Sequence, residues 1–429
     1  MIKPFFCAGS WKTSQEIHDV RSPITAQILS RICLASKKDM ELAVKAAHQS
    51  FKNFRETSSY DRSQYLKKIK EGIGKRREEL AKSVTTEMGK TITEAHGEVD
   101  RAYNTFEIAE EESKRIEGSV LPLDTIATCQ DRFGIYQRFS IGVVFGITPF
   151  NYPLNLAAHK IAPALALGNT IVLKPPLQCP SSALILAEII EEVGVPSGVV
   201  SVVPCSNEVA EYGAFLNEVK LLSFTGSAKV GWHLKKSAHK QKVVLELGGV
   251  AHLIVDANTN LDDIVKKCLR GAFTNAGQSC ISTQMVHVHK TMYDKFFNSF
   301  VAGAERLQVG DPLIDTTQVG PLVSESAALR VEEWVHEALS QGARFHCGNK
   351  REGSYYWPTV LTNVSSEAKI SCEEAFGPIC SVNSYENFDD VLNRVNQTPY
   401  GLQAGLFSNN WSHIWKAYRT LEVGGAHYQ

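Results

Sequence analysis

The sequence predicts an α/β protein whose first half is built on a doubly wound parallel sheet. Apolar runs typical of buried strands alternate with helical segments between residues 141 and 247. Repeated βα units of this kind form parallel sheets with a ligand crevice at the carboxyl ends of the strands. A second α/β block begins near Gly249. The 429 residues, 43% hydrophobic and 21% charged, are enough for two or three domains.

The N-terminal part, residues 1–115, is predicted to be mostly helical. Asp39 is the expected N-cap of a first helix, because apolar residues recur with helical period from Met40 to Phe54. A second helical region, residues 59–115, is rich in Lys and Glu, which we interpret as a solvated helix face. Residues 125–129 and 133–138 are predicted to be two strands separated by a turn.

Strands and helices then alternate regularly. The expected strands are residues 141–147, 170–173, 199–203, 221–224 and 242–247, and the expected helices follow Pro153, Ser181 and Ser227. The formal net charge of −1 gives no field that would draw nucleic acid or an anionic membrane to the surface. The apolar N-terminal patch is too short for a signal peptide, and the longest apolar region is too short and interrupted to span a membrane. We therefore expect a cytoplasmic protein.

The ten cysteines include no C-x-x-C pair, which is typical of a reducing compartment and offers no zinc or redox motif. His287 and His289 lie on one face of a predicted strand. Because no third ligand is near in sequence, we interpret this as a solvated face and predict no metal site. Cys280 differs from the other cysteines, because small and polar neighbours leave its thiol reachable.

Two motifs indicate chemistry at a carbonyl carbon. Cys280 ends the run Gln-Ser-Cys, and Glu246 opens the run Glu-Leu-Gly-Gly. A cysteine nucleophile and a carboxylate base suit attack on a carbonyl followed by hydrolysis of a thioester. Two further runs complete the set, Thr-Pro-Phe-Asn-Tyr-Pro at 148–153 and Phe-Thr-Gly-Ser at 224–227. In this order and at these separations, the four motifs resemble those of the NAD(P)-dependent aldehyde dehydrogenase superfamily.

The resemblance implies a cofactor domain of residues 1–117 and 140–248, an oligomerisation hairpin at 118–139 and a catalytic domain at 249–429. It also implies an enzyme that oxidises a small aldehyde to its carboxylate through a cysteine thiohemiacetal and a thioester. Cys280 would be the nucleophile, Glu246 would activate water, and the Asn151 side chain and the Cys280 amide would bind the oxyanion. Family members that transfer the acyl group to coenzyme A typically lack this glutamate, so Glu246 favours a free acid product.

The usual G-x-G-x-x-G fingerprint of a dinucleotide site is absent, but Gly226 and Ser227 open a helix whose amides can hold a pyrophosphate. The resemblance adds further cofactor-binding residues: Ile147, Thr148, Pro149, Phe150, Lys174, Leu177, Leu247, Glu374 and Phe376. Leu177 occupies the place where NAD-selective members usually carry a glutamate. Without that carboxylate, and with Lys174 nearby, NADP is favoured, while NAD stays open.

The run at 151–160 is similar to members that act on lactaldehyde or glyceraldehyde derivatives, with Asn155, His159 and Arg101 as polar candidates for the pocket. Succinate semialdehyde is the main alternative substrate, and a catalytically silent binding or structural protein of the same fold is the alternative outside this class. Family members continue for a few dozen residues past the position of Gly424, with a strand that joins a neighbouring subunit. We therefore expect a missing C-terminal tail, and a homodimer or homotetramer when that strand is present.

Overall fold

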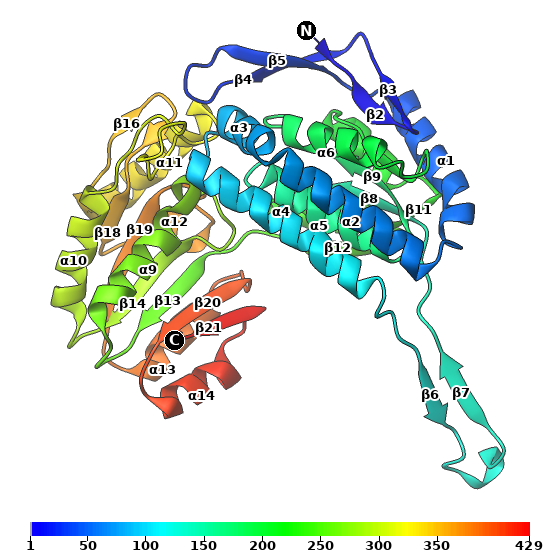
Figure 1. Cartoon of the computed structure of the whole chain (residues 1–429). Coiled ribbons are helices and arrows are strands. Elements are labelled where there is room, and N and C mark those ends of the chain that lie inside the picture. Colours follow the sequence, from blue (N-terminus) through cyan, green and yellow to red (C-terminus); the bar gives the residue numbers. More distant parts are fainter. Residues whose placement is uncertain (1) are drawn as a thin grey trace.

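Each half of the chain folds around a seven-stranded sheet, and the computed structural model describes residues 2–429 (Figure 1). The first sheet has the order β12 (Lys242–Glu246), β11 (Val219–Thr225), β8 (Val143–Ile147), β9 (Thr170–Lys174), β10 (Val200–Val202), β2 (Phe5–Cys7) and β3 (Ser10–Lys12). The five strands from β12 to β10 are parallel, while β2 and β3 are antiparallel to their neighbours. The predicted parallel sheet is therefore confirmed.

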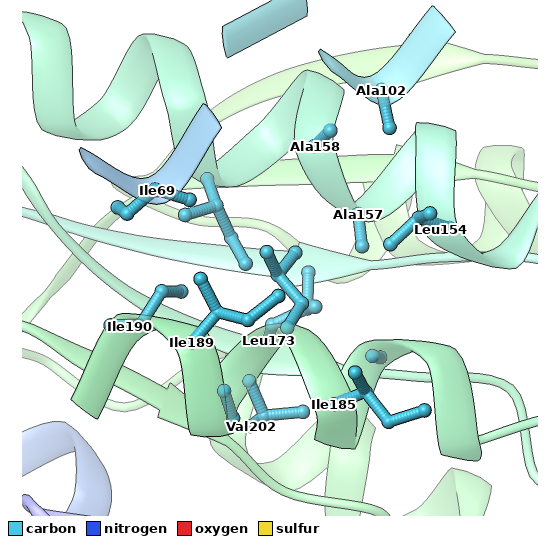
Figure 2. Close-up of a cluster of buried hydrophobic side chains, with 14 of the residues drawn as sticks. Ile69, Ala102, Leu154, Ala157, Ala158, Leu173, Ile185, Ile189, Ile190 and Val202 are labelled. Atoms are coloured by element: carbon cyan, nitrogen blue, oxygen red, sulfur yellow. The ribbon is translucent and has the colours of Figure 1, made fainter. Parts of the chain in front are cut away.

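The helices of the first half are α1 (Lys37–Phe54), α2 (Ser59–Lys75), α3 (Arg77–Met88), α4 (Ile92–Glu112), α5 (Pro153–Ala166), α6 (Ser181–Glu192), α7 (Asn207–Ala214) and α8 (Ala228–Ser237). Figure 2 shows how α2, α4, α5 and α6 pack apolar side chains around Leu173 of β9 and Val202 of β10. Helices α1 and α7 bury their apolar residues in a separate core, with Phe145 of β8 and Leu222 of β11. The sheet is thus covered on both faces, as its continuous apolar strands require.

The second sheet has the order β15 (Arg344–Cys347), β18 (Thr359–Thr362), β19 (Ile379–Tyr385), β14 (Thr283–His289), β13 (Ala251–Val255), β20 (Gln403–Phe407) and β21 (Gly425–Tyr428). Only β15 runs antiparallel to its neighbour among these described strands. Its helical elements are α9 (Leu261–Phe273), η2 (Thr274–Gly277), α10 (Tyr293–Glu305), α11 (Glu325–Ser340), α12 (Lys369–Cys372), α13 (Phe388–Asn396) and α14 (Trp411–Thr420). A small two-stranded sheet pairs β16 (Arg351–Glu352) with β17 (Tyr355–Tyr356). The α/β block predicted from Gly249 onward is confirmed.

The prediction of mostly helix for the N-terminal part is wrong before residue 37. The strands β1 (Ile2–Lys3), β4 (Ile17–Arg21) and β5 (Ile28–Cys33) form a three-stranded sheet, and β2 extends the large sheet through β10. These strands are two to six residues long and are stabilised by partners that are distant in sequence, so local periodicity gives little sign of them. The helices α1 to α4 follow as expected.

The N-cap of α1 is Ser36 and not Asp39. The Ser36 hydroxyl accepts a hydrogen bond from the amide of Asp39 (3.3 Å), and the Asp39 carboxylate accepts one from the amide of Ser36 (2.9 Å). Asp39 therefore stands at the third helical position and completes a capping box.

A long hairpin of β6 (Ser119–Pro122) and β7 (Phe133–Tyr136) projects away from the body of the molecule (Figure 1). The strand predicted at 125–129 is wrong, because that segment forms the tip with a 3₁₀ turn, η1 (Ala127–Cys129). The first strand ends at Pro122, which has no amide hydrogen to continue the ladder. The domain boundaries at 117, 139 and 248 stay a prediction. No helix within residues 2–429 is long and apolar enough to cross a bilayer.

Candidate active site

Cys280 lies between η2 and β14, on a loop held in an unusual backbone conformation. Asn275, Ala276 and Gly277 are three consecutive residues with positive φ, at 54°, 52° and 71°. A Cβ atom at Gly277 would lie 2.0 Å from the carbonyl oxygen of Gly377, so no larger residue fits there. Non-glycine residues in this region carry strain of about 1–3 kcal/mol each and persist only where their surroundings hold them.

Side chains from both halves of the molecule hold this loop. The carboxylate of Glu94 on α4 accepts a hydrogen bond from the amide of Asn275 (2.9 Å). The Asn275 side-chain amide donates to the carbonyl of Asn151 (3.3 Å) and to that of Gln278 (3.0 Å). The Gln278 side chain donates to the Asn275 carbonyl (3.1 Å) and accepts from the amide of Val323 (2.9 Å). The segments that carry Asn151 and Cys280 are therefore adjacent.

The Cys280 thiol is half-buried, whereas seven of the ten cysteines are buried. Burial raises its pKa to about 11, the carboxylates of Glu374 and Glu246 act in the same direction, and Arg101 opposes them. The isolated protein therefore holds a protonated thiol at neutral pH, and attack requires removal of that proton by a base. The carboxylate of Glu246, at the end of β12, is close enough to act on the thiol electrostatically.

Asn151 is buried in the turn between β8 and α5, and its side-chain oxygen has no hydrogen-bond partner among residues 2–429. Helix α5 begins at Pro153 without a side-chain cap of its own. Glu98 of α4 supplies the cap, because its carboxylate accepts hydrogen bonds from the amides of Leu154 (2.9 Å) and Asn155 (3.2 Å). The segment that positions Asn151 is thus fixed by α4.

A fully buried ion pair between Lys90 and Glu98 supports this cap. The Lys90 ammonium group also lies 3.7 Å from the ring centroid of Tyr152, and the Arg101 guanidinium lies 5.4 Å from the same centroid. Two cations therefore contact the aromatic ring that follows Asn151.

Lys160 is a buried residue of the site for which the sequence analysis predicted no role. Its ammonium group donates hydrogen bonds to the hydroxyls of Ser223 (3.1 Å) and Thr225 (2.9 Å) on β11. Burial lowers its pKa to about 8, and the Glu246 carboxylate opposes that shift. A lysine in the mostly apolar helix α5 was the available signal, because buried lysines are rare without a partner.

The predicted cofactor residues gather at the carboxyl ends of β8, β9, β11 and β12. The amide and hydroxyl of Thr148 both donate to the carbonyl of Lys174, at 3.2 and 3.4 Å, which joins the ends of β8 and β9. Lys174 is buried, and burial lowers its pKa. Leu177 is half-buried against the core between the sheet and its helices. Ile147 and Leu247 pack against the core on the opposite face of the first sheet.

The start of α8 offers an anion site. Ser227 is exposed, and its hydroxyl makes no hydrogen bond to the helix it precedes. The amides at a helix start are free to bind an anion, and the helix dipole favours negative charge there. A Cβ atom at Gly226 would lie 2.7 Å from the ring of Phe224, so glycine is required for this turn. These residues fit a dinucleotide pyrophosphate.

Glu374 and Phe376 approach the first half of the molecule from the second. The Glu374 carboxylate accepts a hydrogen bond from the amide of Gly249 (3.3 Å), and burial raises its pKa to about 7. A Cβ atom at Gly248 would lie 2.2 Å from the same carboxylate. The rings of Phe150 and Phe376 meet edge-to-face, with centroids 5.6 Å apart. Residues of three separate motifs are therefore adjacent across the junction between the halves.

A cavity of about 820 Å³ opens beside the nucleophile loop, between α4 and residues 266–275 and 307–319. Its charged lining residues are Lys90, Glu94, Glu98, Arg101, Lys266, Arg270 and Asp315. Lys90 is paired with Glu98, whereas Arg101, Lys266 and Arg270 form no ion pair within the described part of the chain. The cavity therefore presents more positive than negative charge.

Of the three polar candidates for the pocket, Arg101 lies near the nucleophile, whereas His159 lines a separate hollow with Thr105 and Ile108. Arg101 lines the cavity, and its charge lowers the pKa of the Cys280 thiol. Burial and the charge of Arg101 lower the pKa of His159. Asn155 is buried and accepts a hydrogen bond from the Thr105 hydroxyl (3.3 Å), so it has a structural contact as well.

The interpretation of His287 as part of a solvated face is wrong. His287 is buried and lies 2.9 Å, nitrogen to nitrogen, from His252 on the neighbouring strand β13, with the two rings stacked. Burial holds the pKa of both imidazoles below the usual range. No group of three or more His, Cys, Asp or Glu residues within 2–429 is arranged to hold a metal ion.

Comparison with known proteins gives consistent matches over the whole chain. The family model described as the aldehyde dehydrogenase family matches residues 11–428. The 3-sulfolactaldehyde dehydrogenase of Priestia megaterium is 41% identical over 420 residues, which cover 97% of this chain and 87% of that protein.

Solved structures agree. Aldehyde dehydrogenase 21 from Physcomitrella patens, in complex with the reaction product succinate, is 38% identical with a TM-score of 0.98, covering 100% of this chain and 89% of that one. An NADP-dependent enzyme of E. coli is 34% identical with a TM-score of 0.96, covering 99% of this chain and 89% of the other.

Proposed function

This chain belongs to the aldehyde dehydrogenase family, NAD(P)-dependent enzymes that oxidise aldehydes, and we propose that its substrate is a short aldehyde with an anionic group. The observation that carries the proposal is the group of unpaired cations, Arg101, Lys266 and Arg270, in the cavity that the start of the nucleophile loop also lines. A sulfonate or carboxylate at the far end of the substrate would pair with them in a partly desolvated site.

Cys280 is the proposed nucleophile. Its thiol gives up its proton to a solvent molecule, and the sulfur then attacks the aldehyde carbon. The Asn151 side-chain amide and the Cys280 backbone amide donate hydrogen bonds to the oxygen as it becomes negative. A bound nicotinamide ring supplies the acceptor for the hydride that leaves the carbon. The product of this half-reaction is a thioester on Cys280.

Glu246 has its task in the next step of the proposal, because it deprotonates the water that hydrolyses the thioester to a free carboxylate, and the Cys280 sulfur leaves as the thiolate. The charge of this carboxylate favours the ammonium form of Lys160 and opposes the effect of burial on the Lys160 pKa. Its own contacts with Ser223 and Thr225 keep the ammonium group below the strand ends.

The cofactor is NAD(P), and within that class we propose NADP. The hydroxyl of Ser227 and the free amides at the start of α8 would hold the pyrophosphate, while Glu374 and Phe376 would contact the nicotinamide half. Ile147, Thr148, Pro149 and Phe150 would line the crevice at the end of β8. Leu177 leaves no carboxylate that would repel a 2′-phosphate, and Lys174 supplies a cation. The similar E. coli enzyme is NADP-dependent.

The proposed substrate is lactaldehyde-like and carries a sulfonate or a carboxylate. The similar enzyme of Priestia megaterium is named for 3-sulfolactaldehyde, and the similar Physcomitrella patens structure holds succinate. 3-Sulfolactaldehyde and succinate are both short and anionic, which agrees with the positive charge of the cavity. His159 and Asn155 are the proposed contacts for a substrate hydroxyl.

A matched panel of aldehydes tests the proposal. We expect kcat/KM for 3-sulfolactaldehyde and succinate semialdehyde to exceed that for lactaldehyde and butyraldehyde by about tenfold or more, because a desolvated charge pair is worth on the order of 1–3 kcal/mol. Arg101→Met should remove most of this difference and spare the neutral aldehydes. Equal kcat/KM for charged and neutral aldehydes would refute the anionic substrate. Absence of turnover on every aldehyde would favour a silent protein of this fold.

We also propose that the hairpin of β6 and β7 joins a second copy of this chain. It exposes large apolar side chains along both strands, including Phe133 and Ile135, each 70% exposed. A two-stranded hairpin on its own is marginally stable in water, so a partner surface would contribute much of its stability.

A further inference from the structure

We infer that Glu94 is a positioning residue, which holds the nucleophile loop in register with the segment that carries Asn151. This inference rests on the proposed function, in which Asn151 and the Cys280 amide bind the oxyanion. The carboxylate of Glu94 contacts neither of those groups directly. It acts through the amide of Asn275, to which it is hydrogen-bonded at 2.9 Å.

The place of Asn275 in the loop gives this contact its effect. Asn275 is the first of three consecutive residues with positive φ that lead to Cys280 through Gln278 and Ser279. A strained backbone relaxes when its restraints are removed. The hydrogen bond to Glu94 restrains the first residue of this stretch, and the contact of Gly277 with Gly377 restrains the last. Without Glu94, the amide of Asn275 loses its acceptor in a buried position.

The same helix holds the other half of the oxyanion site. Glu98 lies one turn after Glu94 on α4 and caps α5 through Leu154 and Asn155. Residues four apart on a helix face the same side, so one rigid element sets the spacing between the two segments. The side-chain amide of Asn275 completes the link by donating to the Asn151 carbonyl.

The second oxygen of Glu94 indicates that this carboxylate is not there for stability alone. Its Oε2 atom is shielded from solvent and has no hydrogen-bond partner among residues 2–429. Burial raises the pKa of Glu94 above its ordinary range, which reflects the unfavourable desolvation of its charge. A side chain selected only for packing would avoid that cost, since buried unsatisfied oxygens destabilise the folded state.

The experiment compares Glu94→Ala with Glu94→Gln, which keeps one oxygen as an acceptor for the Asn275 amide. Glu111→Ala on the exposed face of α4 is the matched control. We expect kcat of Glu94→Ala to fall about tenfold or more, because a small misplacement of catalytic groups can cost on the order of a hundredfold. Glu94→Gln and Glu111→Ala should stay within about twofold of the parent on the same reasoning. The NADP dissociation constant should be unchanged in all three, and each assay is run well below the Tm of the variant.

A double-mutant cycle with Asn151→Ala separates positioning from a general effect on folding. If Glu94 acts by aligning the oxyanion donors, its loss should reduce kcat much less in the Asn151→Ala background than in the parent. The inference is overturned if Glu94→Ala keeps the parent kcat, if Glu94→Gln falls as far as Glu94→Ala, or if the fold-loss is equal in both backgrounds. Parent-level kcat in Asn151→Ala alone would instead refute the oxyanion role of Asn151, which belongs to the proposed function.

Discussion

Single ionisable groups at this site have pKa values shifted away from the ranges they have in water. Burial favours the neutral thiol of Cys280, the neutral carboxyl of Glu374 and the neutral amine of Lys160. Shifts of this kind gather where chemistry is done, because acids, bases and nucleophiles need pKa values suited to their task. The sequence shows which residue types are present, whereas these shifts depend on burial and are visible only in the fold.

The thiol of Cys280 should react with iodoacetamide at a rate that rises about tenfold per pH unit between pH 7 and 9 in the cofactor-free protein. Only the thiolate reacts, and below a pKa of about 11 its fraction grows tenfold per pH unit. The rate is obtained by peptide mass spectrometry at Cys280, with the exposed Cys372 as an internal reference. A plateau reached below pH 8 would contradict the raised pKa.

Glu374→Gln should stabilise the protein at pH 8 but not at pH 4.5. The folded-state pKa of Glu374, about 7, lies above its ordinary value of 4.5, so the stability from its neutral form is present below pH 4.5 and is lost as pH rises through 7. Glutamine stays neutral and still accepts the Gly249 hydrogen bond. Thermal unfolding of both proteins should show a difference in Tm that opens between pH 4.5 and 7 and then stays constant. A difference independent of pH would contradict the shift.

Elements differ in how far the sequence predicts them. The strands β8 and β9 at the centre of the first sheet are mostly apolar runs, and their burial on both faces follows from that composition. The N-terminal strands are stabilised by partners that are far away in the sequence, and β6 is stabilised by β7 in the projecting hairpin. Local sequence pattern gives little sign of either. The sequence motifs predict roles for Cys280, Glu246 and Asn151, which stay a prediction, while no motif points to Lys160 or Glu94, because the roles proposed for them depend on what surrounds them.

The proposed contact between the hairpin of β6 and β7 and a second copy of this chain can be tested with one substitution. We expect the parent to form a dimer or larger assembly, and Ile135→Glu to shift it toward the monomer, because a charge on an apolar contact face is unfavourable to bury. Arg132→Glu, at the hairpin tip, is the control for added negative charge. Light scattering gives the mass of each protein. Equal masses for the parent and Ile135→Glu would mean that this face of the hairpin is not an interface.

The whole molecule places its chemistry at the junction of two α/β halves. The first half contributes Asn151, Glu246 and the start of α8, and the second contributes Cys280, Glu374 and Phe376. Helix α4 reaches the nucleophile loop from the first half, so the two halves are tied together at the site itself. The charged cavity beside α4 lies at the same junction, since Thr274 and Asn275 of the nucleophile loop line it together with residues of α4.

The most direct test of the central claim is intact and peptide mass spectrometry of Glu246→Gln after incubation with NADP and 3-sulfolactaldehyde. Without its general base for water, the enzyme should complete the oxidation once and stop at the thioester. We predict a single acyl adduct on Cys280, with one equivalent of reduced cofactor per active site and no adduct in the Cys280→Ala variant. Steady turnover at the parent rate without an adduct, or an adduct on another residue, would contradict the roles assigned to Cys280 and Glu246.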